Sequence, residues 1–266
     1  MEYRELVSLY ESLGKTTKKL EKTRLLADFL PRLKGHEEHV YLLRGRVFPD
    51  YDSREFGIST QLVIKAIAKA SGLSSELVNE QFKKIGDLGD VAALVIGSKR
   101  QSPLVSRVLS VEHVFLSLCK LAEMTGGGSV ERKMVVCAEL LTSASVAEAR
   151  YIIRTLLSDL RVGVADALLT DAITLAFFEP TMATKVQNAY DLLTDFALVL
   201  KMAFKGAPTF EHVRLVPGRP MNVMLAVKAA DFEDAFRICG KPAAIEHKCD
   251  GFRIIISNDG KNVKLF

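Results

Sequence analysis

Residues 59–86 have the sequence STQLVIKAIAKASGLSSELVNEQFKKIG, and this stretch decides the fold class. Apolar residues recur in it at three- and four-residue intervals, which is the spacing of one helical face. Ser59 and Ser74 stand where N-caps belong, and Gly72 and Gly86 stand where helices end. The stretch therefore predicts two short amphipathic helices joined by a tight turn.

The same signals recur from the N-terminus to about residue 205. Ser145 with Glu148 three residues later forms a capping box, and Pro180 restarts the chain for two more helices that end near Lys205. The other expected helices are Val111–Ala122, Val130–Leu141, the capping-box helix through Leu157, and Val164–Phe177. We therefore expect residues 1–208 to form an all-helical domain.

A different pattern begins after Pro208. Alternating apolar and β-branched residues predict strands at Ala244–Lys248, Arg253–Ser257 and Asn262–Phe266. The Asn-Asp-Gly-Lys segment at residues 258–261 predicts a hairpin turn. We assign residues 209–266 to the start of an α+β domain, which we expect to be incomplete because about 58 residues make a poor independent core. The expected fold class is mainly α.

Composition excludes several classes of protein. Of 266 residues, 48% are hydrophobic and 26% charged, which excludes a disordered or collagen-like chain. The longest apolar runs, such as Val91–Ile96, are far shorter than the roughly 18 residues that span a bilayer. Residues 1–5 show no signal-peptide pattern. We therefore expect a soluble cytoplasmic protein without a membrane partner.

The charge is only mildly basic overall. The chain holds 36 Lys and Arg against 32 Asp and Glu, a net charge of +4. Between Lys15 and Arg46, nine basic residues face four acidic ones. Such a run is typical of a solvated face, and it would also attract a phosphate backbone. The charge alone leaves both interpretations open.

Cysteine and histidine spacing predicts no metal centre. No CxxC pair occurs among Cys119, Cys137, Cys239 and Cys249, so we expect neither a zinc site nor disulfides from them. His36 and His39 are three residues apart, but no other candidate ligand is grouped with them. We expect no metal site there.

Residues 246–253, Glu-His-Lys-Cys-Asp-Gly-Phe-Arg, contain the most informative motif, KxDGxR. A lysine amine is a nucleophile only when deprotonated, and burial beside other cations lowers its pKa from about 10.4. Lys248 ends an expected strand before the Asp250–Gly251 turn, which would hold the amine at a fixed point. Arg253 follows on the next strand and can reach a phosphate or ribose. An ordinary charged hairpin explains these residues equally well.

KxDGxR resembles the first motif of the covalent nucleotidyltransferases, which include ATP-dependent DNA ligases, RNA ligases and mRNA-capping enzymes. Other segments are similar, in the same order, to the N-terminal part of replicative DNA ligases of the archaeal and eukaryotic type. They are Gly86–Ala92 (GDLGxVA), Ser129–Lys133 (GSxxRK), Glu148–Arg154 (EAxYLVR), Asp159–Val164 (LRIGV) and Gly218–Ala226 (PxxPMLA). An RNA ligase or capping enzyme would not explain the helical domain, so the chain most resembles the N-terminal portion of an ATP-dependent DNA ligase.

The resemblance implies a three-step reaction. Lys248 attacks the α-phosphate of ATP, AMP passes to the 5′-phosphate at a nick in duplex DNA, and the 3′-hydroxyl displaces it. Mg2+ would neutralise the developing phosphate charge. By position in the motif, Glu246 would recognise adenine and Arg253 would contact the nucleotide. Asp250 and Gly251 would shape the turn, with Asp250 near the metal-bound phosphate.

The resemblance also implies a setting. The enzyme would act as a monomer on nicked DNA in replication, repair, recombination and cell division, in the cytoplasm at the nucleoid. Several glycines and cations of the helical domain would contact the DNA backbone, because a glycine at a helix end lets a phosphate approach free N–H groups. Ordinary turn glycines are the alternative. The expected contacts are Gly89, Gly127, Arg132, Lys133, Arg161 and Gly163.

Two further interpretations stay open. In archaeal relatives a Gln-led hydrophobic loop docks onto the sliding clamp, and Lys99–Val105 lies near the matching point. Its aromatic pair is absent, which favours a plain inter-helix loop. The chain also reaches Phe266 before any later nucleotidyltransferase motif, so a non-catalytic DNA-binding module is the alternative function.

Overall fold

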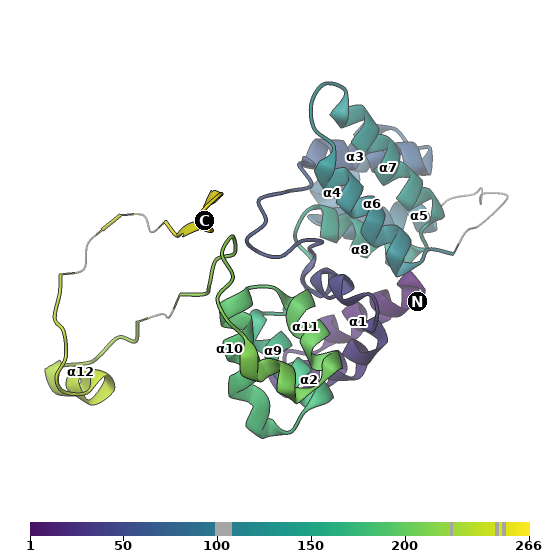
Figure 1. The fold of residues 1–266 in the computed structure, drawn as a ribbon. Coiled ribbons are helices and arrows are strands. Elements are labelled where there is room, and N and C mark those ends of the chain that lie inside the picture. Colours follow the sequence, from purple (N-terminus) through teal and green to yellow (C-terminus); the bar gives the residue numbers. More distant parts are fainter. Residues whose placement is uncertain (99–107, 224–225, 248–249, 252–253) are drawn as a thin grey trace.

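The computed structural model describes residues 1–98, 108–223, 226–247, 250–251 and 254–266. Two helical lobes pack together, and the C-terminal segment extends away from them (Figure 1). None of the helices in these ranges is long and apolar enough to cross a bilayer. The mainly α fold class is confirmed.

The first lobe, which we call lobe A, is formed by six consecutive helices. Its elements are α3 (Thr60–Ser71), α4 (Ser75–Ile85), α5 (Leu88–Gly97), α6 (Val111–Glu123), α7 (Ser129–Ser143) and α8 (Val146–Leu156). Helix α5 packs along α8, and α3 packs along α7. Helices at the two ends of this segment are therefore brought together.

The second lobe, lobe B, combines both ends of the helical region. Its elements are α2 (Lys19–Phe29), η1 (Leu30–Leu33), η2 (Glu37–Arg44), α9 (Asp166–Phe177), η3 (Pro180–Met182), α10 (Ala183–Leu193), α11 (Phe196–Lys205) and η4 (Ala207–His212). Helix α2 packs along α9, and α11 packs against η2. Helix α1 (Tyr3–Lys15) contacts both lobes. Its buried Tyr10 donates a hydrogen bond of 2.7 Å to the Leu42 carbonyl and packs 5.0 Å, centroid to centroid, from Tyr151 of α8.

Local capping explains where the helices begin and end. The Ser59 and Ser74 hydroxyls accept hydrogen bonds from the backbone of their first turns, and Gly72 and Gly86 end those helices with φ of +77°. The predicted capping box at Ser145 and Glu148 is present. The helix expected from Val164 begins at Asp166 instead, because Ala165, its N-cap, has an extended backbone.

The C-terminal segment contains α12 (Phe232–Cys239) and an antiparallel hairpin of β1 (Ile256–Asn258) and β2 (Val263–Leu265). The Asp259 carboxylate accepts hydrogen bonds from the N–H groups that follow it, which closes the predicted turn. The predicted strand at 244–248 was wrong for its described residues, 244–247, which are not in a strand. Among the described residues, none beyond Phe210 is buried.

Candidate nucleic-acid interface

Two turns of lobe A lie against each other and form the centre of the candidate interface. The first turn, residues 86–88, joins α4 to α5, and the second, residues 157–165, leaves α8. Arg161 lies in the second turn with a φ of +58°, and its guanidinium Nη1 is 2.7 Å from the Asp87 Oδ2 atom of the first. The half-exposed Arg161 side chain therefore joins the turns while facing solvent.

Asp87 is the buried centre of this arrangement. Its side chain is 8% exposed, caps α5 by accepting the Asp90 N–H at 2.8 Å, and lies 3.2 Å from the Arg154 guanidinium. Burial by itself would raise the pKa of this carboxyl. The Asp90 N–H and the guanidiniums of Arg154 and Arg161 outweigh burial and hold the pKa below its ordinary value. Asp87 is therefore ionised at neutral pH and fixes both turns.

Gly89 lets α5 approach α8 closely. A Cβ atom at this buried position would lie 2.8 Å from the Arg150 carbonyl oxygen and 2.8 Å from the Arg154 Cγ atom. Backbone atoms cannot move aside cheaply at such a separation. The DNA contact of Gly89 stays a prediction, and the absence of a Cβ atom here also lets α5 pack against α8.

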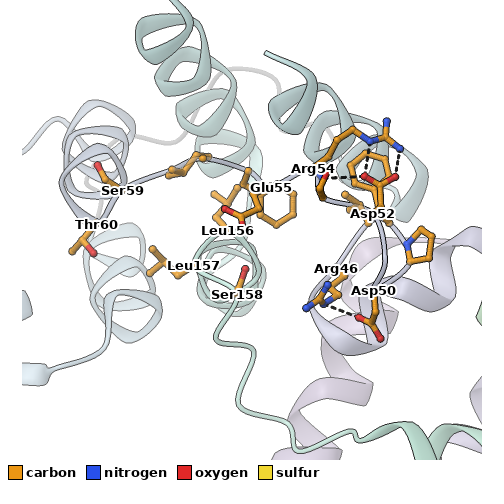
Figure 2. Close-up of a pocket in the computed structure, with 18 residues that line it drawn as sticks. Arg46, Asp50, Asp52, Arg54, Glu55, Ser59, Thr60, Leu156, Leu157 and Ser158 are labelled. Carbon is orange, nitrogen blue, oxygen red and sulfur yellow. Dashed lines mark hydrogen bonds and ion pairs between the residues drawn. The ribbon is translucent and has the colours of Figure 1, made fainter. Parts of the chain in front are cut away.

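Two adjoining cavities mark the surface between the turns. The smaller, about 120 Å³, is lined by both turns and shares Thr60 and Leu157 with the larger. The larger, about 1030 Å³, is lined by residues 45–60 and the end of α8 (Figure 2). Arg46 pairs with Asp50 and Arg54 with Asp52 along its wall, so these cations are already neutralised. Arg161 beside the smaller cavity is paired as well, with Asp87 and Asp159. What distinguishes the smaller cavity is that it lies at the start of α5.

Lys83 and Lys84 extend the positive charge of this surface, and the sequence analysis missed them. Both are exposed in the last turn of α4, just before Gly86, and neither forms an ion pair with any residue of the described chain. A basic doublet directly before a helix-ending glycine was the available signal. With Arg161, they place three cations around the first turn.

Three further residues predicted to contact DNA lie at the start of α7, and they differ in exposure. Gly127 and Arg132 are exposed, and nothing lies within 4 Å of a Cβ atom built at Gly127. Lys133 is buried, and its amine donates a hydrogen bond of 2.6 Å to the Phe56 carbonyl. Lys133 therefore supports the loop at residues 56–57, and its burial argues against a direct phosphate contact.

Gly163, also predicted to contact DNA, is exposed in the second turn with a φ of +66°. A Cβ atom at this position would lie 2.7 Å from the Lys22 amine. That amine donates a hydrogen bond of 2.5 Å to the Val162 carbonyl, so the second turn is also tied to α2. Glycine suits this position because both its left-handed backbone and the nearby lysine disfavour a side chain.

The predicted nucleotide residues are not gathered into a pocket. Glu246, Asp250 and Gly251 are exposed, and none of them lines the cavities described above. Lys248 and Arg253 lie outside the described residues, as does the whole predicted clamp-docking loop at residues 99–105. In the described part of the chain, no set of three or more metal-ligating side chains occurs near Asp250. These residues therefore do not fit a magnesium site by themselves.

Comparisons with known proteins give a consistent result. A family model described as "DNA ligase N terminus" matches residues 2–174. A DNA ligase of Thermococcus fumicolans is 40% identical over all of this chain and 48% of its own length. DNA ligases of Nanoarchaeum equitans and Methanobrevibacter smithii are 39% and 35% identical over the whole chain and over 47% and 48% of their lengths. The chain spans about half the length of the curated relatives it matches.

Proposed function

The chain belongs to the archaeal-type ATP-dependent DNA ligases as an N-terminal portion, and on that premise we propose that it grips nicked duplex DNA for strand sealing. In this proposal residues 1–208 are the DNA-binding domain and residues 209–266 begin the adenylation domain. The binding is directed at the DNA backbone, because a nick sealer must act regardless of sequence.

The observation that carries this proposal is the pair of turns joined by Arg161 and Asp87. Helices α3 and α5 both begin beside the smaller cavity, at Thr60 and Leu88. Helix N-termini favour anions through their N–H groups and dipole. Lys83 and Lys84 lie nearby and form no ion pair with the described residues. A phosphate placed here would meet positive charge from these lysines and from a helix end.

The chemistry follows from the family and from Lys248. The lysine amine forms a P–N bond to the α-phosphorus of ATP, and the bond to the pyrophosphate leaving group breaks. AMP then moves to the 5′-phosphate of the nick, and the 3′-hydroxyl attacks that phosphate and releases AMP. Glu246 binds adenine and Arg253 binds the nucleotide. Mg2+ accompanies ATP, but no step is assigned to it, since the described residues form no site for it near Asp250.

The cellular setting follows from the substrate. A monomeric enzyme that seals nicks works at the nucleoid in the cytoplasm, in replication, repair, recombination and cell division. Residues 99–105 are kept as a clamp-docking candidate.

Replacing Arg161 tests the DNA-binding proposal. We expect Arg161→Ala to weaken binding to a nicked duplex about tenfold at low salt, since a charge-assisted contact is worth about 1.5 kcal/mol or more. We also expect the slope of log K against log salt to become shallower by about one, as for one lost phosphate contact. Fluorescence anisotropy over a salt series measures both.

Arg32→Ala is the matched control. Arg32 lies in η1 of lobe B, is more than half exposed, and pairs with Glu5 at 3.1 Å. Its loss should change neither affinity nor slope. An Arg161→Ala variant that binds like the wild type, or a wild type whose binding ignores salt, would overturn the proposed interface.

A further inference from the structure

Four metal-ligating side chains meet where η2 packs against α6. They are His36, Glu38, His39 and Glu112, and one ligand atom from each lies within 4.8 Å of the others. The first three lie at the start of η2, and Glu112 lies in the first turn of α6. The sequence predicted no metal site here because no further ligand stood near the two histidines. That reasoning was wrong about the grouping, since the fold supplies Glu112 from a distant helix.

His39 is the buried ligand of this group. Its side chain is 4% exposed, and its Nε2 atom lies 3.0 Å from the Glu112 Oε2 atom. Apart from this ion pair, neither atom has a hydrogen-bond partner among the described residues. The same carboxylate oxygen is 3.3 Å from the His36 Nδ1 atom. Three potential metal ligands therefore converge on one point.

The surroundings hold His39 in position. The His36 ring stacks on the His39 ring with centroids 5.1 Å apart, and Phe115 packs edge-on against His39 at 4.9 Å. The ligand set is thus partly ordered by packing alone.

We propose that His36, Glu38, His39 and Glu112 bind one zinc ion. Zinc takes imidazole and carboxylate ligands in a tetrahedron with bonds of about 2.0–2.2 Å, which separates ligand atoms by about 3.3–3.6 Å. The separations of 3.0 and 3.3 Å around the Glu112 oxygen are close to such an edge. Mg2+ and Ca2+ prefer oxygen ligands, so two imidazoles favour zinc.

A zinc ion here would have a structural role. It would tie η2 of lobe B to α6 of lobe A, next to the buried Phe115. The inference does not depend on DNA binding or adenylation, because none of the four residues lines the candidate interface.

The test is metal titration of the metal-free 266-residue chain. Isothermal titration with Zn2+ should give one site per chain, and Co2+ in its place should give the visible bands of a tetrahedral ion without thiolate charge transfer. Glu112→Gln and His36→Ala change half-exposed side chains, so their folding can be confirmed by circular dichroism. Each substitution should lower the affinity for zinc at least about 10- to 100-fold. Mutating a residue that only hydrogen-bonds to a metal ligand already causes a loss of this size.

His113→Ala is the matched control, because His113 is next to Glu112 in α6 but outside the four-residue group. It should bind zinc like the wild type. Absence of zinc binding would overturn the proposal. So would equal binding by Glu112→Gln and the wild type, or a Co2+ spectrum with thiolate bands, because each would place the ion at other residues.

Discussion

A Lys248→Ala variant is expected to accept no AMP from ATP. The lysine amine is the atom to which AMP becomes bonded, so its loss removes the covalent step, and labelling should fall by about 10³-fold or more. The test protein joins residues 1–266 to the remaining half of the Thermococcus fumicolans relative, which matches this chain along its whole length. Incubation with α-labelled ATP and Mg2+ measures the label, which should survive alkali and be released by acid, as a P–N bond requires.

Lys261→Ala is the control for this experiment, because Lys261 lies in the nearby hairpin turn and outside the KxDGxR motif. It should be labelled like the unmodified fusion. Equal labelling of the Lys248→Ala variant would show that another residue is the nucleophile. A folded fusion that binds nicked DNA but is never labelled would favour the non-catalytic DNA-binding module instead.

An Asp87→Ala variant is expected to lose about 3–5 kcal/mol of unfolding free energy. The substitution removes the α5 cap and one of the two carboxylates, Asp87 and Asp90, that pair with the Arg154 guanidinium, which is only 15% exposed. Urea unfolding measures the change. Asp159→Ala is the matched control: Asp159 also pairs with Arg161, but it is half exposed, so its loss should cost about 1 kcal/mol or less. Equal losses in both variants would contradict the assigned role of Asp87.

The same carboxylate predicts a dependence on pH. The pKa of Asp87 is lower in the folded chain than the value of about 3.9 expected when unfolded. Its contribution to stability is therefore complete above that value and is lost as the pH falls through the folded pKa. The stability difference between the wild type and Asp87→Asn should be constant from pH 5 to 7 and shrink below pH 4. A stability difference that stays constant below pH 4 would contradict this electrostatic account.

Local signals were sufficient to predict the helices of both lobes. Ser59, Ser74 and Ser145 begin helices where their side chains cap the first turn, and Gly72 and Gly86 end helices in the left-handed region. These features depend on residues within one turn of each other, which a sequence displays directly. Gly89, Arg161 and Gly163 in and beside the two turns were named from the resemblance to DNA ligases and not from these signals.

Long-range packing could not be predicted from those signals. Gly89 was expected to contact DNA, and the close approach of its backbone to the Arg150 carbonyl was not foreseen. Lys133 was also expected to contact DNA, and its amine reaches the Phe56 carbonyl, 77 residues away in the chain. Glu112 of lobe A likewise lies beside His36 and His39 of lobe B, which are far from it in the sequence. Each of these contacts depends on which elements pack together in the fold, and the local sequence pattern does not predict that packing.

The predicted strand at residues 244–248 shows a second limit. An alternating apolar pattern favours a strand only when a neighbour supplies hydrogen bonds and covers the apolar face. Ile245 is 85% exposed, and the only sheet among the described residues is the β1–β2 hairpin. The hairpin forms because its own turn supplies the partner strand, whereas residues 244–247 do not belong to that sheet.

The central claim is that the two joined turns bind DNA. Its most direct test is hydrogen exchange of the 266-residue chain, measured with and without a nicked duplex. The account predicts slower amide exchange in residues 86–90 and 158–164 when DNA is bound, and unchanged exchange in α2 outside the turn that carries Lys22. Bound DNA that leaves both turns unprotected, or that protects α2 throughout instead, would contradict it.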